Sequence, residues 1–112
     1  MPDTITLDNL NISRDRFDVR IGDRRIDLTY LEFELLHLLA AQPGRVLSRE
    51  EICAALWDED VGNANKLTVH VSRLRQKMSG SSWSIHTVKK RGYALAEADR
   101  STQLQAAPFK MR

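Results

Sequence analysis

The chain has 112 residues, of which 42% are apolar and 29% charged, and a formal net charge of +2, which suits one globular domain with a modest core. No stretch approaches the roughly 20 apolar residues that a membrane helix requires, and residues 1–4 lack the features of a secretory signal, so we expect a cytoplasmic protein with no membrane partner. The single cysteine, Cys53, can close no internal disulfide and has no second cysteine to complete a zinc site, so we expect no metal and no cofactor.

The first thirty residues show the two-residue period of short strands. Two dipeptides, Asp8-Asn9 and Gly22-Asp23, each divide an alternating stretch into two arms, as the turn of a hairpin does. We therefore predict a small antiparallel sheet that begins near residue 5, after a short lead over residues 1–4. The apolar residues expected on its buried face are Ile5, Leu7, Leu10, Ile12, Phe17, Val19, Ile21, Ile26 and Leu28.

At Thr29 the period changes to about 3.6 residues, which marks the first of two closely spaced helices. Thr29 with Glu32 forms a capping box, and Ser48 with Glu51 repeats it at the start of the second helix. Pro43-Gly44 is expected to end the first helix. The expected inward residues are Leu31, Leu35, Leu38 and Leu39 in the first helix, and Ile52 and Leu56, joined by Cys53 or Trp57, in the second.

A third helix is predicted over residues 65–78, after an acidic loop over residues 58–64. Spacings of four, three and four place its apolar residues on one face: Leu67, Val71, Leu74 and Met78. A rotation of about 100° per residue puts a mostly polar, short-chained set opposite them. That set is Asn65, Val69, Ser72 and Gln76, flanked by Thr68 and Arg73.

A β-hairpin is expected after a flexible link over residues 79–82. Alternation over Trp83, Ile85, Thr87 and Val88 indicates its first strand, Lys89-Lys90-Arg91-Gly92 its turn, and residues 93–95 its second strand. Periodicity fades from Glu97, so residues 97–112 are predicted to form a flexible tail. One domain over residues 5–96 is therefore expected.

Positive charge is gathered in the third helix and the hairpin. Residues 65–93 hold seven basic residues and no Asp or Glu, a local charge of +7, whereas the remaining 10 basic and 15 acidic residues leave the rest of the chain at −5. Like charges crowded together repel one another unless a partner neutralises them. This pattern favours a protein that binds a polyanion over the alternative, a solvated basic face without a partner.

Four blocks of sequence, in the same order, resemble the DNA-binding effector domain of the OmpR/PhoB family of response regulators. They are residues 28–36 (LTYLEFELL), residues 46–52 (VLSREEI), residues 69–77 (VHVSRLRQK), and Thr87-Val88 with Gly92-Tyr93. The resemblance implies an α+β fold, a winged helix-turn-helix with an N-terminal antiparallel sheet, three helices and a C-terminal β-hairpin wing. This fold agrees with the elements predicted above from periodicity and capping.

The same resemblance implies binding of double-stranded DNA at promoters, often as a pair of copies arranged head to tail on tandem repeats. The recognition helix would be residues 65–78 in the major groove, and the wing would be residues 87–93 in the adjacent minor groove. In the family, the loop that corresponds to residues 57–64 can touch RNA polymerase.

Individual roles also follow from the matching positions. Thr68 and Arg73 would face base edges, Ser72 would lie near the backbone, and Lys89 would reach into the minor groove. The family commonly has an acid where this chain has Thr68, and a glycine where it has Lys90, so the base preference and the shape of the turn are not carried over. The receiver domain that precedes the effector domain in response regulators is absent from this sequence.

The chemistry of several cations leaves two roles open. Arg73 can offer its fork to guanine, which reads sequence, or to a phosphate, which only fixes position. Arg75 can reach a phosphate or pair with an acid elsewhere, and Lys66 and Lys77 can serve phosphate or solvent, while His70 is expected to contact backbone or phosphate. The full set of expected DNA-binding residues is Asn65, Lys66, Thr68, Val69, His70, Ser72, Arg73, Arg75, Gln76, Thr87, Lys89, Lys90 and Arg91.

Two other functions compete with DNA binding. A protein-interaction adaptor would contact RNA polymerase or another regulator through an exposed tryptophan beside acids, at Trp57, Asp58, Glu59 and Asp60. RNA binding is disfavoured because the pattern of the third helix suits a wide groove better than single-stranded loops. No nucleophile, base and orienting group occur together, and no glycine-rich phosphate loop is present, so we expect no enzymatic activity.

Overall fold

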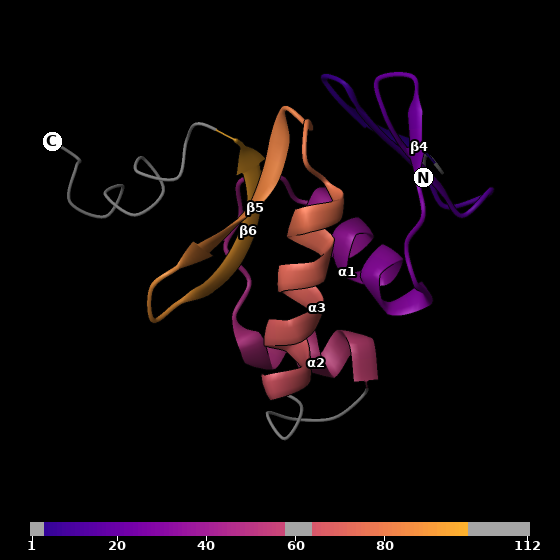
Figure 1. The fold of residues 1–112 in the computed structure, drawn as a ribbon. Helices are drawn as coiled ribbons and strands as arrows, with labels where there is room; N and C mark the ends of the chain where they lie inside the picture. Colours follow the sequence, from indigo (N-terminus) through magenta and orange to yellow (C-terminus); the bar gives the residue numbers. More distant parts are fainter. Residues whose placement is uncertain (1–3, 58–63, 99–112) are drawn as a thin grey trace, which may run out of the picture.

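An N-terminal sheet, three helices and a C-terminal hairpin follow one another along the chain (Figure 1). The computed structural model describes residues 4–57 and 64–98. The expected fold class is confirmed, since the elements have the order and pairing of a winged helix. They are β1 Thr4–Leu7, β2 Leu10–Ser13, β3 Asp18–Ile21, β4 Arg24–Ile26, α1 Tyr30–Ala40, α2 Arg49–Trp57, α3 Ala64–Lys77, β5 Trp83–Val88 and β6 Gly92–Glu97.

The N-terminal sheet is antiparallel, with strand order β1-β2-β3-β4. Its turns fall at Asp8-Asn9 and Gly22-Asp23 as expected, and the row Ile5, Ile12, Val19 and Ile26 runs across its inner face. The first strand begins at Thr4, and β6 ends at Glu97, one residue beyond each bound expected for the domain.

Two residues expected in strands of this sheet lie outside them. Phe17 belongs to the turn between β2 and β3, where its φ of 55° removes it from the pleat and leaves 40% of the residue exposed. Its ring stacks on Phe33 of α1, with 4.1 Å between the centroids. Leu28 lies in the connection to α1 and is half-buried against the core. Phe17 and Leu28 both continue the alternation of apolar and polar residues in the strand beside them. Periodicity alone therefore could not show that they lie outside the strands.

The capping box at the start of α1 is confirmed. The Thr29 hydroxyl accepts from the Glu32 amide at 3.2 Å, and the Glu32 carboxylate accepts from the Thr29 amide at 2.9 Å. The expected inward stripe was partly wrong, because Leu31 and Leu38 are only half-buried. Since α1 packs against α2, α3 and β6, its buried surface is wider than one stripe and includes Glu32, Phe33, Leu35, Leu36, Leu39 and Ala40.

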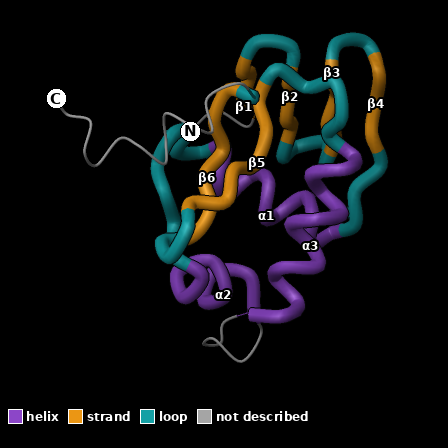
Figure 2. Tube along the Cα trace, turned by 60° about the vertical axis from the view of Figure 1, so that its left-hand side comes forward, coloured by secondary structure: helices purple, strands orange, loops and turns teal. Residues whose placement is uncertain are grey.

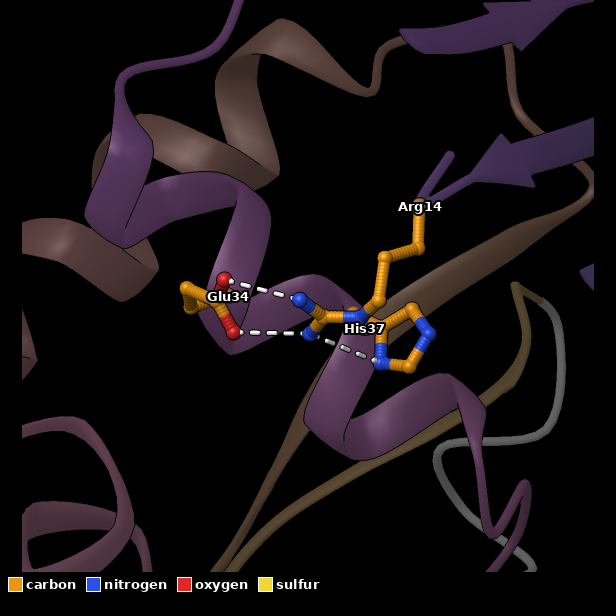
Figure 3. Close-up of polar contacts among 3 residues, drawn as sticks. All are labelled: Arg14, Glu34 and His37. Carbon is orange, nitrogen blue, oxygen red and sulfur yellow. Dashed lines mark hydrogen bonds and ion pairs between the residues drawn. The ribbon is translucent and has the colours of Figure 1, made fainter. Parts of the chain in front are cut away.

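Arg14, at the end of β2, ties the sheet to α1 (Figure 3). Its guanidinium makes two contacts with the Glu34 carboxylate, at 2.8 and 3.2 Å, and Nη2 lies 3.4 Å from Nδ1 of His37. His37 is half-buried beside Phe33. Burial and the nearby Arg14 charge lower the pKa of His37 more than the Glu34 carboxylate raises it.

The buried face predicted for the third helix is confirmed, and that of the second helix in part, since Leu56 is only half-buried. Ser48 and Glu51 form the expected capping box of α2, with contacts of 2.8 and 3.0 Å, and Ile52 and Cys53 are its buried residues. In α3 the buried residues are Leu67, Val71, Leu74 and, just beyond its end, Met78. Within the described residues, no helix combines the length and apolar character needed to cross a membrane.

The C-terminal hairpin is anchored to the segment before α2. Leu47 and Tyr93 exchange two backbone hydrogen bonds, of 2.9 and 3.0 Å, so the segment at Leu47 pairs with β6 as a third backbone segment beside the two strands. Gly92 lies against this crossing with φ of 143°, and a Cβ atom there would stand 1.9 Å from the Leu47 carbonyl oxygen. The hairpin therefore leaves the core at a fixed point, with its turn beside α2 (Figure 2).

Candidate nucleic-acid interface

The outward face of α3 is determined by the residues that the helix buries. Leu67, Val71 and Leu74 are at most 2% exposed, so the side chains on the other side of the helix point away from the core. The exposed residues there are Lys66, Thr68, Val69, Ser72, Arg73 and Gln76, and all six belong to the expected set. Asn65 lies in the first turn of α3, but its side chain is outside the described part of the chain.

Val69 stands out on this face because it is apolar and 45% exposed. It lies one residue from Thr68 and four residues from Arg73, so it sits between them on the helix surface. The face therefore offers hydroxyl, guanidinium, amide and methyl groups side by side, without any acid.

The tip of the hairpin carries three exposed cations. Lys89, Lys90 and Arg91 form the connection between β5 and β6, and the Arg91 amide donates to the Val88 carbonyl at 2.9 Å to close the turn. Lys90 has φ of 64°, the left-handed conformation that glycine adopts most easily. Lysine thus occupies the position where the resembling family usually has glycine.

Strand β5 of the wing lies beside α3 (Figure 1). Arg75 joins them, because its Nε donates to the Ile85 carbonyl at 2.9 Å and its Nη2 to the Thr87 hydroxyl at 3.0 Å. The sequence left a phosphate or an acid as partners for Arg75. The structure instead gives it two uncharged acceptors on β5. Neither the helix face nor the hairpin tip is covered by other described parts of the chain.

A hollow of about 440 Å³ separates the hairpin tip from the start of α2. Four cations and one carboxylate contribute to its lining, so its net charge is positive. The lining residues are Arg49, Glu50, Thr87, Val88, Lys89, Lys90, Arg91 and Gly92. The side chain of Arg49 was missing from the expected set; the Ser48 cap, which places Arg49 in the first turn of α2, was the signal that could have included it.

Lys77, for which the sequence suggested phosphate or solvent, pairs with an acid of the protein while its side chain stays 38% exposed. Its ammonium lies 2.7 Å from Oε1 of Glu32, whose side chain is 1% exposed. The ion pair forms because Lys77 sits at the end of α3, where the helix faces α1. The charge that Lys77 adds to the basic segment is therefore compensated inside the protein.

His70 and Trp57 pack on each other. Their rings are 5.8 Å apart and nearly parallel, and both residues are half-buried. Nδ1 of His70 is buried and has no hydrogen-bond partner among the described residues. The exposed tryptophan expected for an adaptor is thus wrong, while Asp58, Glu59 and Asp60 lie outside the described residues.

Other kinds of site find little support in the described part of the chain. There, no three His, Cys, Asp or Glu side chains gather where they could hold a metal ion. His86 donates from Nε2 to the Glu97 carbonyl at 2.8 Å, and Cys53 is buried in the core. These groups belong to the packing of the domain.

A helix with an open polar face, a preceding helix packed against it and a cationic hairpin beside it define the winged helix-turn-helix class. Comparison with known proteins identifies the family. The pattern described as the C-terminal domain of transcriptional regulatory proteins matches residues 23–95. The chain belongs to this family, the OmpR/PhoB-type effector domains.

Curated relatives are identical to this chain at about a third of the aligned positions. The heme response regulator HssR of Staphylococcus epidermidis is 36% identical over 92 residues, which are 80% of this chain and 41% of that protein. An uncharacterized transcriptional regulatory protein, YkoG of Bacillus subtilis, is 34% identical over 94 residues, 81% of this chain and 41% of that protein. The chain thus spans less than half the length of these relatives.

Solved structures resemble the whole described fold. The RstA DNA-binding domain of Klebsiella pneumoniae, in complex with the RstA box, has a TM-score of 0.76 and 27% identity over 83% of this chain and 96% of that domain. The DNA-binding domain of CpxR from E. coli has a TM-score of 0.73 and 30% identity over 85% of this chain and 97% of that domain.

Proposed function

We propose that this protein binds double-stranded DNA in a sequence-specific manner and regulates transcription. The observation that carries the proposal is an open, acid-free face of α3 next to a wing tipped with three cations, with Arg75 of α3 hydrogen-bonded to β5 of that wing. Membership of a transcriptional regulatory family and the likeness to a domain solved on its DNA box support it.

In this proposal α3 enters the major groove. A helix about 10 to 12 Å across fits that groove, where every base pair offers a distinct pattern of donors and acceptors. Thr68, Gln76 and Arg73 supply hydrogen-bonding groups, and Val69 supplies an apolar contact. The planar guanidinium of Arg73 can bind guanine with two parallel hydrogen bonds to O6 and N7.

The wing would occupy the adjacent minor groove. A narrow minor groove concentrates negative potential, which attracts side chains such as Lys89, Lys90 and Arg91. The hollow between the wing tip and α2 has a net positive lining that suits a phosphate of the backbone passing between the grooves. The two elements would thus hold one strand from both sides.

Salt dependence tests the proposal directly. Each phosphate neutralised lowers the slope of log K against log salt concentration by about 0.9, so several contacts produce a steep decline. The binding sequence would first be obtained by selection from genomic fragments, followed by footprinting. Undetectable binding to selected duplexes, or binding that salt does not weaken, would reject DNA binding as the function.

The role of Arg73 can be separated from that of charge alone. Arg73→Ala should cost about 1 to 3 kcal/mol on the selected site and less on random duplex, because base recognition is lost. Arg16→Ala, which removes the same charge from the turn between β2 and β3, should leave the preference unchanged. An equal loss for Arg73→Ala on both duplexes would make Arg73 a phosphate contact instead of a base reader.

We also infer finer features from the family resemblance. Two copies are expected to bind head to tail on tandem repeats in the cytoplasm, which comparison of one and two repeats in a sizing experiment would test. Contact with RNA polymerase through Trp57, Asp58, Glu59 and Asp60 is a second role that the resemblance implies. Charge reversal of Asp58 and Glu59 that leaves polymerase capture unchanged would remove it.

A further inference from the structure

Arg75 is exposed to solvent, yet it makes hydrogen bonds to other groups of the protein. Nε reaches the Ile85 carbonyl at 2.9 Å, and Nη2 reaches the Thr87 hydroxyl at 3.0 Å. Both acceptors belong to β5, two residues apart, while Arg75 belongs to α3. One guanidinium therefore links α3 to the first strand of the wing.

The two acceptors restrict the guanidinium more than a single hydrogen bond would. The guanidinium is planar and its donors point in fixed directions, so contacts through Nε and Nη2 define both the distance and the tilt of β5 relative to α3. A lysine has one ammonium on a flexible stem and lacks this planar fork. The link consequently depends on the shape of arginine as well as on its charge.

Arg75 contacts β5 close to the wing tip, so its contacts can set the position of the tip. Ile85 is 2% exposed and belongs to the core, whereas Thr87 is exposed and lies two residues before Lys89. Two residues of strand span about 7 Å. Arg75 thus holds β5 at two positions, one at a buried residue and one at an exposed residue near the wing tip.

We propose that Arg75 is a positioning residue that holds the wing at a set distance from α3, and so matches its cations to the minor groove while α3 occupies the major groove. This inference rests on the proposed DNA binding. It assigns to Arg75 a task different from the phosphate contact that its charge alone suggests, because both of its observed contacts are made to the protein.

The proposal and the phosphate alternative differ in how Arg75 combines with the wing. A phosphate contact acts independently, so its removal costs the same whether or not the wing is charged. A residue that positions the wing matters only while the wing has cations to place. A thermodynamic cycle with a neutral wing, carrying Lys89→Gln, Lys90→Gln and Arg91→Gln, therefore separates them.

The first experiment measures binding of the selected duplex by Arg75→Lys, with the native wing and with the neutral wing. Arg75→Lys keeps the charge but not the fork, and should weaken binding about tenfold with the native wing and less than about twofold with the neutral wing. Lys66→Met, which removes a cation from the exposed side of α3, is the control and should cost the same in both backgrounds. An equal loss for Arg75→Lys in both backgrounds, or native affinity throughout, overturns the proposal.

A second measurement on the free protein does not depend on DNA. Amide hydrogen exchange at residues 87–91 should be faster in Arg75→Lys than in the native protein, while exchange in the buried turns of α3 stays unchanged. Unchanged exchange at the wing would contradict the positioning role. If the native protein itself fails to bind any duplex, the proposed function falls, whereas the exchange result still decides whether Arg75 holds the wing.

Discussion

The ammonium of Lys77, at the end of α3, lies 2.7 Å from Oε1 of Glu32, the carboxylate that also accepts from the Thr29 amide at 2.9 Å. One buried oxygen therefore caps α1 and holds the last turn of α3. Burial raises the pKa of Glu32, but the hydrogen bond and charge of Lys77, together with the Thr29 contacts, outweigh it and hold that pKa below its ordinary value of 4.5. The carboxylate is thus charged in the folded protein at neutral pH.

Acid should destabilise the domain through Glu32. Because its pKa is lower in the folded than in the unfolded state, the ionised carboxylate contributes stability above its unfolded pKa, and this contribution is lost as pH falls through the folded value, below 4.5. Urea unfolding midpoints between about pH 3 and pH 7 would measure this loss. Glu32→Gln, which retains a capping side chain, should flatten that part of the profile.

Lys77→Met provides the complementary variant for the same pair. Without the ammonium, Glu32 remains buried and its carboxylate keeps the Thr29 contacts, so the pKa of Glu32 should rise in the folded state and the loss of stability in acid should become smaller. At neutral pH the loss should be about 1 to 3 kcal/mol. A stability profile for Lys77→Met that parallels the native one would show that the pair does not couple α1 to α3.

Gly92→Ala should detach or strain the wing. The added Cβ would lie 1.9 Å from the Leu47 carbonyl oxygen, which is backbone and cannot rotate away, so we expect a loss of about 3 kcal/mol in unfolding free energy. Gly22→Ala is a matched control, because Gly22 also has positive φ but nothing within 4 Å of its Cβ position. That variant should lose only about 1 kcal/mol. Equal urea midpoints for the two variants would reject the contact as the cause.

Lys90→Gly should stabilise the domain and weaken DNA binding together. Glycine relieves the left-handed conformation at φ of 64°, for an expected net gain of about 0.5 to 1 kcal/mol in thermal unfolding. Lys90→Ala removes the same charge but keeps the strained Cβ, so it should weaken binding equally without the gain. If Lys90→Gly were no more stable than Lys90→Ala, the turn would not be strained.

Local sequence signals account for much of this fold. Both capping boxes and the four buried residues of α3 were predictable, because each depends on residues within one or two helical turns. The outward face of α3 followed from the same spacing. The structure therefore places the residues expected to read bases where the helical period puts them.

Contacts between distant segments were not predictable in the same way. The Lys77 to Glu32 pair spans 45 residues, and the crossing of Leu47 with Tyr93 spans a similar distance. Charge counting treated Lys77 as free because it cannot identify a partner on another helix. Arg75 was ambiguous for the same reason, since its acceptors are a backbone carbonyl and a hydroxyl, which carry no charge signal.

Val69→Ala should reduce affinity only where the bound site presents a thymine methyl to α3. Val69 is 45% exposed, so the substitution removes no core packing, and alanine favours the helix. Apolar side chains contact the thymine methyl in the major groove, and loss of the valine methyls should cost about 1 kcal/mol. Replacing that thymine by deoxyuridine, which lacks the methyl, should weaken the native protein by a similar amount and leave Val69→Ala unaffected. Additive losses from the two changes would mean that Val69 contacts something else.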